Sequence, residues 1–374
     1  MGNIMILLTG AYRPFFPAAA LFAGMSIPLW LIAHSGAATP VTDPYLWHQH
    51  EMLWGYLPAA LAGFLFTAIP NWTGRPALSP MALLALFTLW LAGRAAMFAA
   101  PDAATSQLLT ASFLPVAAAL ALREIVAAGN TRNIVVVAMI AGFWAAQIVF
   151  LWFDTQIGVT AGFAVSLVLM TLIGGRVTPA FSRNWLKKRG ATRLPPEFGT
   201  VDKSALLLTV ATALLWIVTD TSMLTGIAAA LAALAQALRL SRWRGLAVWK
   251  EPLLFAQHAA YAWLVIGLGL LAATSLGDWV SSDQAHHALG AGAIGTMTAI
   301  VMLRALLGHS GRPIEATRAD TLLFSVLHLG AALRVCAGWV DDPTLLYHAG
   351  GTLWAVGMIA LALRAFPIAI APRL

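Results

Sequence analysis

Cysteine and charge are both scarce in this chain. Its one cysteine, Cys336, excludes an internal disulfide, a CxxC pair and a CxxCH motif for covalent haem attachment. Charged residues make up only 10% of the sequence and hydrophobic residues 60%, proportions that exclude an ordinary soluble domain. The sequence therefore predicts an integral membrane protein.

Long apolar runs recur along the chain, each close to the roughly 20 residues that a helix needs to cross a bilayer. Windows of about 19 residues predict twelve spans. They lie at 14–34, 51–70, 80–100, 106–127, 133–153, 157–176, 204–220, 222–240, 253–275, 286–308, 320–340 and 345–367. We expect an all-α, polytopic membrane helical bundle in which residues 1–374 form a single integral-membrane domain. The first span lacks the flanks of a cleavable signal, so we expect it to be retained.

Positive charge is confined to alternate connections. Apart from Arg94 and Arg334, every lysine and arginine falls on one predicted face, at Arg13, Arg75, Arg123, Arg132, residues 176–203, 239–250 and 304–318, Arg364 and Arg373. The opposite connections carry acidic residues, at Asp43, Asp102, Asp154, Asp220, Asp278, Asp283, Asp341 and Asp342. The positive-inside rule then places both termini in the cytoplasm. This topology explains the pI near 10.1 without a nucleic-acid partner.

The longest polar segment, "RVTPAFSRNWLKKRGATRLPPEFGTVDK" at 176–203, is predicted to be a basic cytoplasmic connection between the sixth and seventh spans. Pro179 is expected to end the helix of the sixth span, because proline cannot donate the backbone hydrogen bond that a helix interior needs.

Arg94 and Arg334 lie inside the third and eleventh predicted spans. An ionised side chain there costs about 2.5–3.5 kcal/mol on insertion scales, so each is expected to face a partner within the bundle. Two alternatives stay open. Each arginine is a structurally paired or snorkelling residue, or it clamps an anion such as a haem propionate, since its fork matches a carboxylate.

The nine histidines fall into two predicted layers. The outer layer holds His34, His48, His50, His286, His287 and His348, with Glu51 beside them, and the inner layer holds His258, His309 and His328. A continuous helix from His287 to His309 would cover about 33 Å, so these two cannot serve one metal centre. A lone histidine usually only makes hydrogen bonds, whereas several on different helices also suit metal or haem ligation.

Two segments of the chain are similar to each other. "HEMLWGYLPAALAGFLFTAIPNWTGRP" from His50 and "HALGAGAIGTMTAIVMLRALLGHSGRP" from His287 align without gaps and share the first histidine, Gly55 with Gly292, and the closing Gly-Arg-Pro. This predicts a parallel repeat of four-helix units, in which His50 and His287 are equivalent. Two such histidines could clamp one haem iron, with Arg94 and Arg334 near its propionates.

Six blocks in order resemble the NnrS family of bacterial membrane proteins. They are "YRPFF" at 12–16, "WHQHEMLWGY" at 47–56, "AGFLFTAIPNWTGRP" at 62–76, "LWLAGR" at 89–94, "HHALGAGAIGTMT" at 286–298 and "LGHSGRP" at 307–313. The resemblance implies a twelve-span protein of the bacterial inner membrane that contains haem and copper and acts in defence against nitric oxide and nitrosative stress.

The family pattern falls on individual residues of this chain, namely His48, His50, Glu51, His258, His287 and His309. The resemblance implies noncovalent haem b on His50 and His287, and a second site for haem or copper on His258 and His309. His286, His328 and His348 match no block and are expected to be packing or surface residues. Ser310 stands where the family tends to have threonine, which preserves the hydroxyl.

Two classes of function follow. In the first, the protein binds nitric oxide as a ligand, or reduces it as a haem-dependent oxidoreductase, which would require an open iron position and an electron donor such as quinol or a redox protein. In the second, it is a transporter or channel for a metal, haem or a small anion, with the intramembrane histidines and arginines lining the path.

Overall fold

The computed structural model describes residues 3–277 and 279–374, so Asp278 of the predicted acidic connections lies outside the described residues. Within this part of the chain, twelve helical segments are long and apolar enough to cross a membrane, which confirms the predicted number. The protein is therefore a polytopic, helical membrane protein.

The helices follow one another along the chain with short connections. Their bounds are α1 Asn3–Leu7, α2 Tyr12–His34, α3 Pro44–His50, η1 Glu51–Tyr56, α4 Leu57–Thr73, α5 Pro80–Ala99, α6 Ala104–Ala111, α7 Phe113–Ala127, η2 Thr131–Asn133, α8 Ile134–Trp152, α9 Thr155–Leu169, η3 Met170–Gly174, α10 Gly175–Lys188, α11 Thr200–Thr219, α12 Met223–Ser241, η4 Gly245–Val248, α13 Pro252–Gly277, α14 Ser282–His287, η5 Ala288–Gly295, α15 Thr296–His309, α16 Arg318–Cys336, η6 Ala337–Trp339 and α17 Thr344–Ile370.

The residues group into two compact units. Unit 1 comprises Met1–Gly162, Met302–Ile314 and Met358–Leu374, and unit 2 comprises Phe163–Val301 and Glu315–Gly357. The single integral-membrane domain over residues 1–374 stays a prediction.

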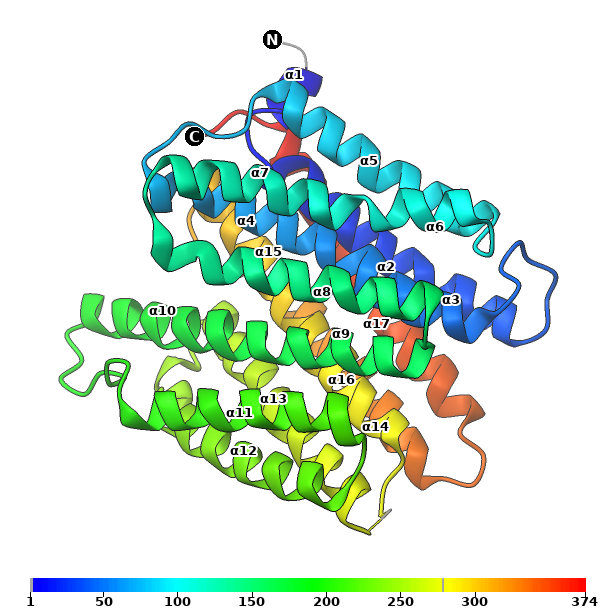
Figure 1. Ribbon diagram of the computed structural model, residues 1–374. Helices are drawn as coiled ribbons and strands as arrows, with labels where there is room; N and C mark the ends of the chain where they lie inside the picture. The colour runs from blue at the N-terminus through cyan, green and yellow to red at the C-terminus, as the bar shows by residue number, and fades with distance from the viewer. Residues whose placement is uncertain (1–2, 278) are drawn as a thin grey trace. The chain divides into compact units, whose positions relative to one another are not determined.

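Unit 1 is built on α2 and α4, which pack together, with α7 packed against α4 and α8 against α7 (Figure 1). Its core contains Phe15, Phe16 and Trp54, all nearly inaccessible. Because lipid is as apolar as these side chains, close packing and polar contacts hold such helices together. Arg13, on the predicted basic face, is only 3% exposed, and its Nη1 donates to the carbonyls of Ala369 and Ala371 at 2.7 Å.

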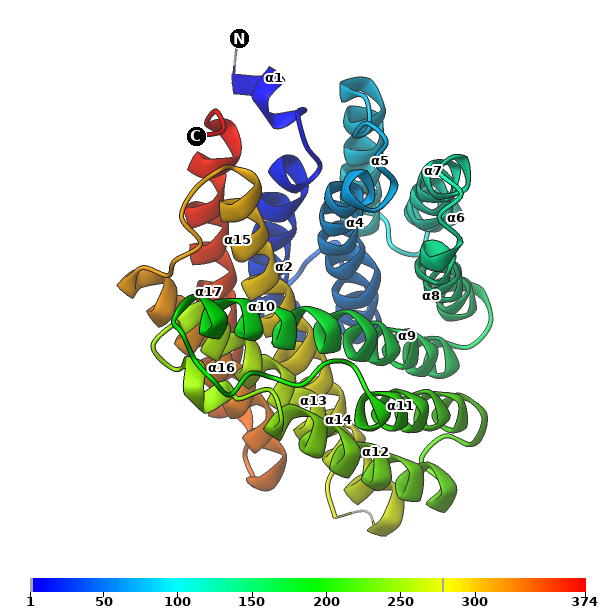
Figure 2. The ribbon, with the colours of Figure 1, turned by 90° about the vertical axis from the view of Figure 1, so that its left-hand side faces the viewer.

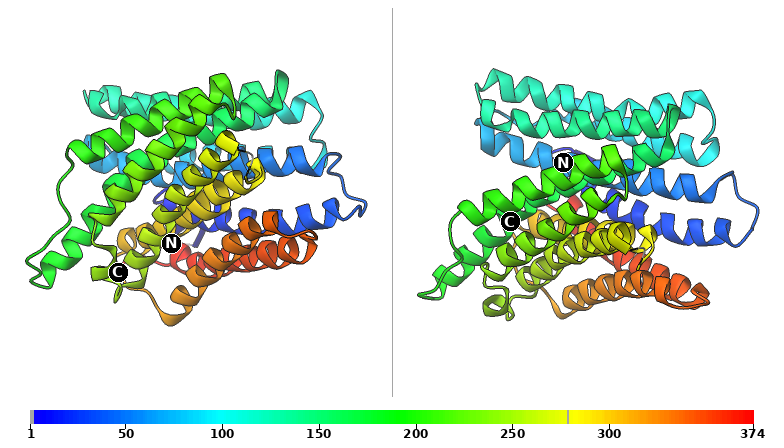
Figure 3. Two further views of the ribbon diagram at one scale, coloured as in Figure 1. Left: turned by 90° about the horizontal axis from the view of Figure 1, so that it is seen from below. Right: turned by 60° about the horizontal axis from the view of Figure 1, so that its bottom comes forward.

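In unit 2, the helices α11, α12 and α13 pack in sequence, each against the next (Figure 2). The helix α16 lies along the first half of α17 (Figure 3). Small residues permit this approach: a Cβ added to Gly330 would lie 2.7 Å from the backbone nitrogen of Trp354, and one added to Gly350 would lie 2.9 Å from that of Arg334. This reciprocal pair of glycines is the kind of contact through which membrane helices associate.

Gly330→Ala is expected to lower the free energy of unfolding by about 1–3 kcal/mol, because the new methyl group must push apart two backbones. The measurement is thermal unfolding of the detergent-purified protein. Gly269→Ala is the matched control in α13, where no described atom lies within 4 Å of the added Cβ. A variant of Gly330 as stable as that control would contradict the close approach.

π-helical turns interrupt three of the described spans, at Glu51–Tyr56, Met170–Gly174 and Ala288–Gly295. The prediction that Pro179 ends the sixth span is wrong, since Pro179 lies inside α10 and the helix continues to Lys188. The first half of the predicted polar connection is therefore helical. The proline is tolerated because only the carbonyl of Gly175, four residues earlier, loses its helical partner, and that carbonyl accepts a hydrogen bond from Arg239.

Candidate functional site

His50 is the last residue of α3 and is 1% exposed. Its Nδ1 lies 2.7 Å from Oε1 of Glu51, and its Nε2 lies 3.1 Å from Nε2 of Gln147 on α8. Because an amide nitrogen can only donate, Nε2 of His50 is the acceptor, and the ring proton is on Nδ1, where it donates to Glu51. The histidine is thus a neutral imidazole anchored at Nδ1.

Arg94 of α5 completes this group. Its Nη1 donates to both carboxylate oxygens of Glu51 at 2.6 Å, and its Nη2 donates to the hydroxyl of Thr110. A Cβ on Gly55 would lie 2.7 Å from the same Nη1, so only glycine leaves room for the guanidinium. Arg94 is 5% exposed and Glu51 is inaccessible, so the ion pair is shielded from water. The buried triad of unit 1 is therefore His50, Glu51 and Arg94.

Unit 2 contains a second triad that also consists of a histidine, a carboxylate and an arginine. His287, the last residue of α14, has its Nδ1 2.8 Å from the backbone carbonyl of Asp283 and 3.0 Å from Oδ1 of the same residue. Arg334 of α16 donates from Nη2 to Oδ2 of Asp283 at 2.7 Å. The guanidinium also lies 4.3 Å from the ring centroid of Tyr347. This triad is partly open, with side-chain exposures of 22% for His287 and 45% for Asp283.

The two triads occupy matching places in the predicted repeat. Each histidine ends a short α-helix, a π-helical turn begins at the very next residue, and the arginine comes from the following span. The carboxylates do not match, since Glu51 follows its histidine whereas Asp283 precedes His287 by one helical turn. Asp283 was therefore not predicted as a site residue and lies among the predicted acidic connections, although its i,i+4 spacing to His287 indicates the contact.

The inner histidines lie in different units. In unit 2, His258 of α13 is 5% exposed, and its Nδ1 lies 2.8 Å from the carbonyl of Leu254, with the hydroxyl of Ser182 3.4 Å from Nε2. In unit 1, His309 ends α15 half-buried, with its ring centroid 5.6 Å from that of Tyr12. A joint site on His258 and His309 stays a prediction.

The other histidines make packing and surface contacts. The Trp30 ring lies 4.9 Å from His48 and 5.0 Å from His34, between ring centroids. His286 stacks on Phe163 and Trp216, His328 accepts a hydrogen bond from Trp263, and His348 is exposed.

The histidines can be compared with what metal and haem ligation require of protein side chains. Over residues 3–277 and 279–374, no three histidine, cysteine, aspartate or glutamate residues come close enough to hold a metal ion together. Haem needs only one or two protein ligands. In His50, His258 and His287 the Nδ1 is fixed by a carboxylate or carbonyl, as in most metal-ligating histidines, which leaves Nε2 as the ligand atom. At His50 the Gln147 amide would have to turn aside.

Comparison with curated proteins finds no match. The sequence profile of the NnrS protein family, in contrast, matches residues 6–373, which is essentially the whole chain and includes both triads. The chain therefore belongs to the NnrS family, a membership that supports a general role in the response to nitric oxide.

Proposed function

We propose that the protein is a haem protein of the bacterial inner membrane that binds nitric oxide in defence against nitrosative stress, with His50 and His287 as haem ligands. The observation that carries this proposal is the pair of histidine–carboxylate–arginine triads in unit 1 and unit 2. Haem, when bound, would supply an iron to which nitric oxide can bind.

In the first triad the Glu51 carboxylate orients the imidazole and keeps the proton on Nδ1, and in the second the carboxylate and the backbone carbonyl of Asp283 do so together. In both, this makes Nε2 a stronger donor to a metal. The arginine holds the carboxylate ionised and in place through charge-assisted hydrogen bonds. Arg334 has a further capacity, because its Nη1 is buried and makes no hydrogen bond with any described residue. This N–H is the donor that we assign to a haem propionate.

The remaining parts of the proposal come from charge and from the family. Both termini lie in the cytoplasm, since the basic connections share their side. His258 and His309 are proposed ligands for a second haem or for copper. Reduction of nitric oxide would in addition require an electron donor, such as quinol or a redox protein, whereas binding requires none.

The test is an absorption spectrum of the detergent-purified protein in the oxidised state, in the reduced state and in the reduced state with nitric oxide, together with iron and copper counts. We expect a reduced haem b spectrum that changes on addition of nitric oxide. A spectrum indifferent to nitric oxide would contradict nitric oxide binding at the haem. A protein without haem would overturn the proposal and favour a transporter of a metal, haem or a small anion.

A further inference from the structure

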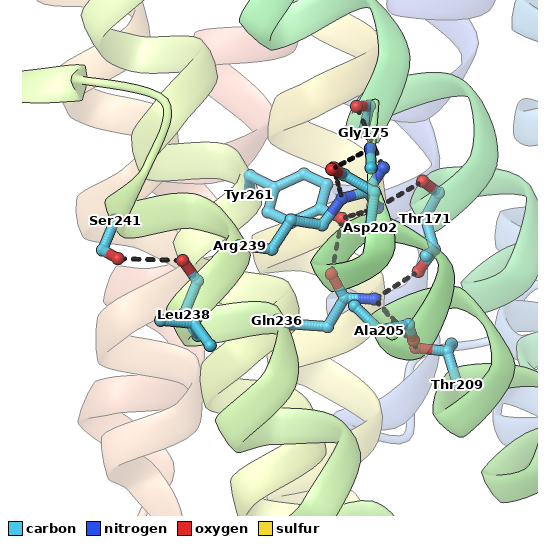
Figure 4. Close-up of polar contacts among 11 residues, drawn as sticks. Thr171, Gly175, Asp202, Ala205, Thr209, Gln236, Leu238, Arg239, Ser241 and Tyr261 are labelled. Carbon is cyan, nitrogen blue, oxygen red and sulfur yellow. Dashed lines mark hydrogen bonds and ion pairs between the residues drawn. The ribbon is translucent and has the colours of Figure 1, made fainter. Parts of the chain in front are cut away.

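Unit 2 contains a buried polar network centred on Arg239 of α12 (Figure 4). This arginine belongs to the predicted basic face, but it is only 2% exposed. Its guanidinium contacts side chains or carbonyls from the sixth span, α11 and α13. A charge so placed in a membrane protein points to a specific task.

Two of its hydrogen bonds go to the backbone at the place where a π-helical turn and Pro179 interrupt the α-helical hydrogen bonds of the sixth span. The helix itself continues through this place, which we call the break. Nη2 donates to the carbonyl of Gly175 at 3.1 Å, and Nη1 donates to the carbonyl of Thr171, inside the π-helical turn, at 3.0 Å. The Gly175 carbonyl has no α-helical donor, because the residue four positions later is Pro179. Arg239 therefore supplies from another helix the hydrogen bond that the proline removes.

Side chains of α11 and α13 fix the guanidinium of Arg239 in this position. Nε donates to Oδ1 of Asp202 at 2.7 Å, and Nη1 donates to the hydroxyl of Tyr261 at 3.0 Å. Tyr261 in turn donates to Gln236, whose amide nitrogen donates to Thr209 at 2.8 Å. Four of the five guanidinium N–H groups are thus used, in a planar fork that lysine cannot reproduce.

Gly175 has a second role in this contact. A Cβ at this position would lie 2.3 Å from Nη1 of Arg239, so any larger residue would force the guanidinium away. Pro179 thus leaves the Gly175 carbonyl without a helical donor, and the absence of a side chain at Gly175 allows Arg239 to reach that carbonyl.

The helix that begins at this break leads to His258. Gly175, Thr178 and Ser182 lie on one face of α10, at i, i+3 and i+7. Thr178 accepts a hydrogen bond from Gln257 of α13 at 3.1 Å, and the Ser182 hydroxyl lies 3.4 Å from Nε2 of His258. The direction of α10 after the break therefore determines whether the Ser182 hydroxyl lies next to Nε2 of His258.

We propose that Arg239 is a positioning residue: by capping the broken sixth span it fixes α10, and with it the hydroxyl face that meets Gln257 and His258. The inference rests on the proposed function only in giving His258 a ligand role. A simple Arg239–Asp202 ion pair is the competing account, and it gives Pro179 no part.

The experiment is a double-mutant cycle of Arg239→Lys and Pro179→Ala, read by hydrogen exchange of the peptides covering 175–188. Lysine keeps the charge beside Asp202 but cannot reach four acceptors, so we expect exchange to rise roughly three- to tenfold, as for one lost hydrogen bond. Pro179→Ala restores an N–H to the Gly175 carbonyl and is expected to return most of that protection in the double variant. Equal effects of Arg239→Lys in the two backgrounds would overturn the proposal.

A second readout separates positioning from general loosening of the fold. Modification of individual histidines by diethyl pyrocarbonate, quantified by peptide mass spectrometry, is expected to rise at His258 in Arg239→Lys and to fall back in the double variant. His328, in the same unit but on α16, is the control and should not change. A parallel rise at both histidines would mean that the variant has loosened the unit, and unchanged His258 would remove the link to α10.

Neither readout depends on haem or nitric oxide, so the failure of this inference and the failure of the proposed function are distinguishable.

Discussion

Arg94→Met is expected to lower the free energy of unfolding by about 3–5 kcal/mol, because it leaves the Glu51 carboxylate buried without its cation. Glu51 is inaccessible, and Arg94 supplies both of the hydrogen bonds that its two oxygens receive at 2.6 Å. The measurement is equilibrium unfolding of the detergent-purified protein, followed by circular dichroism.

The partner substitution tests the cause of that loss. Glu51→Gln removes the buried charge, so the double variant of Arg94→Met and Glu51→Gln should be more stable than Arg94→Met alone. If the stability lost in the double variant equalled the sum of the losses in the two single variants, the buried ion pair would be contradicted.

The second triad provides a control with the same chemistry and more solvent. The Asp283 side chain is 45% exposed, so Arg334→Met leaves a carboxylate that water can still solvate. We expect a loss of about 1 kcal/mol or less from the ion pair there. Equal losses at Arg94 and Arg334 would show that burial does not govern the cost.

The number of spans could be predicted because hydropathy over about 20 residues reports directly on the bilayer. Most span ends agree with the prediction within a few residues, but the start of the second span and the end of the sixth do not, since π-helical turns there carry the helix through polar residues. The second span begins at Pro44 rather than near residue 51, and the sixth continues past Pro179 to Lys188. In the sixth span, Arg239 of another helix donates to the carbonyl that Pro179 leaves without a partner, so the proline does not end the helix.

In the candidate site, too, some features could be predicted from the sequence and others could not. The positions of His50 and His287 could be matched from sequence, because the segments that follow them align without gaps. The partner of Arg239 could not, because Asp202 is 37 residues away and no local spacing links the two. Contacts of this kind depend on which helix faces which, and hydropathy alone does not encode that choice.

The pairing of Arg94 and Arg334 with carboxylates bears on both alternatives that the sequence left open. Each arginine does have a structural partner, in Glu51 or Asp283. Under the proposed function the same carboxylate also orients a haem ligand, so one contact would serve both the packing of the helices and the orientation of the histidine.

His287→Ala is expected to remove most of the haem that depends on this ligand and to leave the bundle folded. The side chain is 22% exposed and its salt bridge to Asp283 is partly solvated, so its loss costs little stability. Haem per protein, from the pyridine haemochrome spectrum, is the measurement. His348→Ala, at an exposed position in the same unit, is the matched control and should keep its full haem content.

A substitution of Asp283, whose carboxylate contacts His287, tests the same ligand assignment independently. Asp283→Asn keeps the ligand but weakens its orientation, and loss of such a partner typically lowers metal affinity by about 10–100-fold. Haem should therefore dissociate faster from Asp283→Asn than from the parent protein, while added imidazole should restore a haem spectrum to His287→Ala and have no such effect on Asp283→Asn. If His287→Ala retained full haem content, His287 would not be a ligand, and the second triad would have to be assigned a structural role alone.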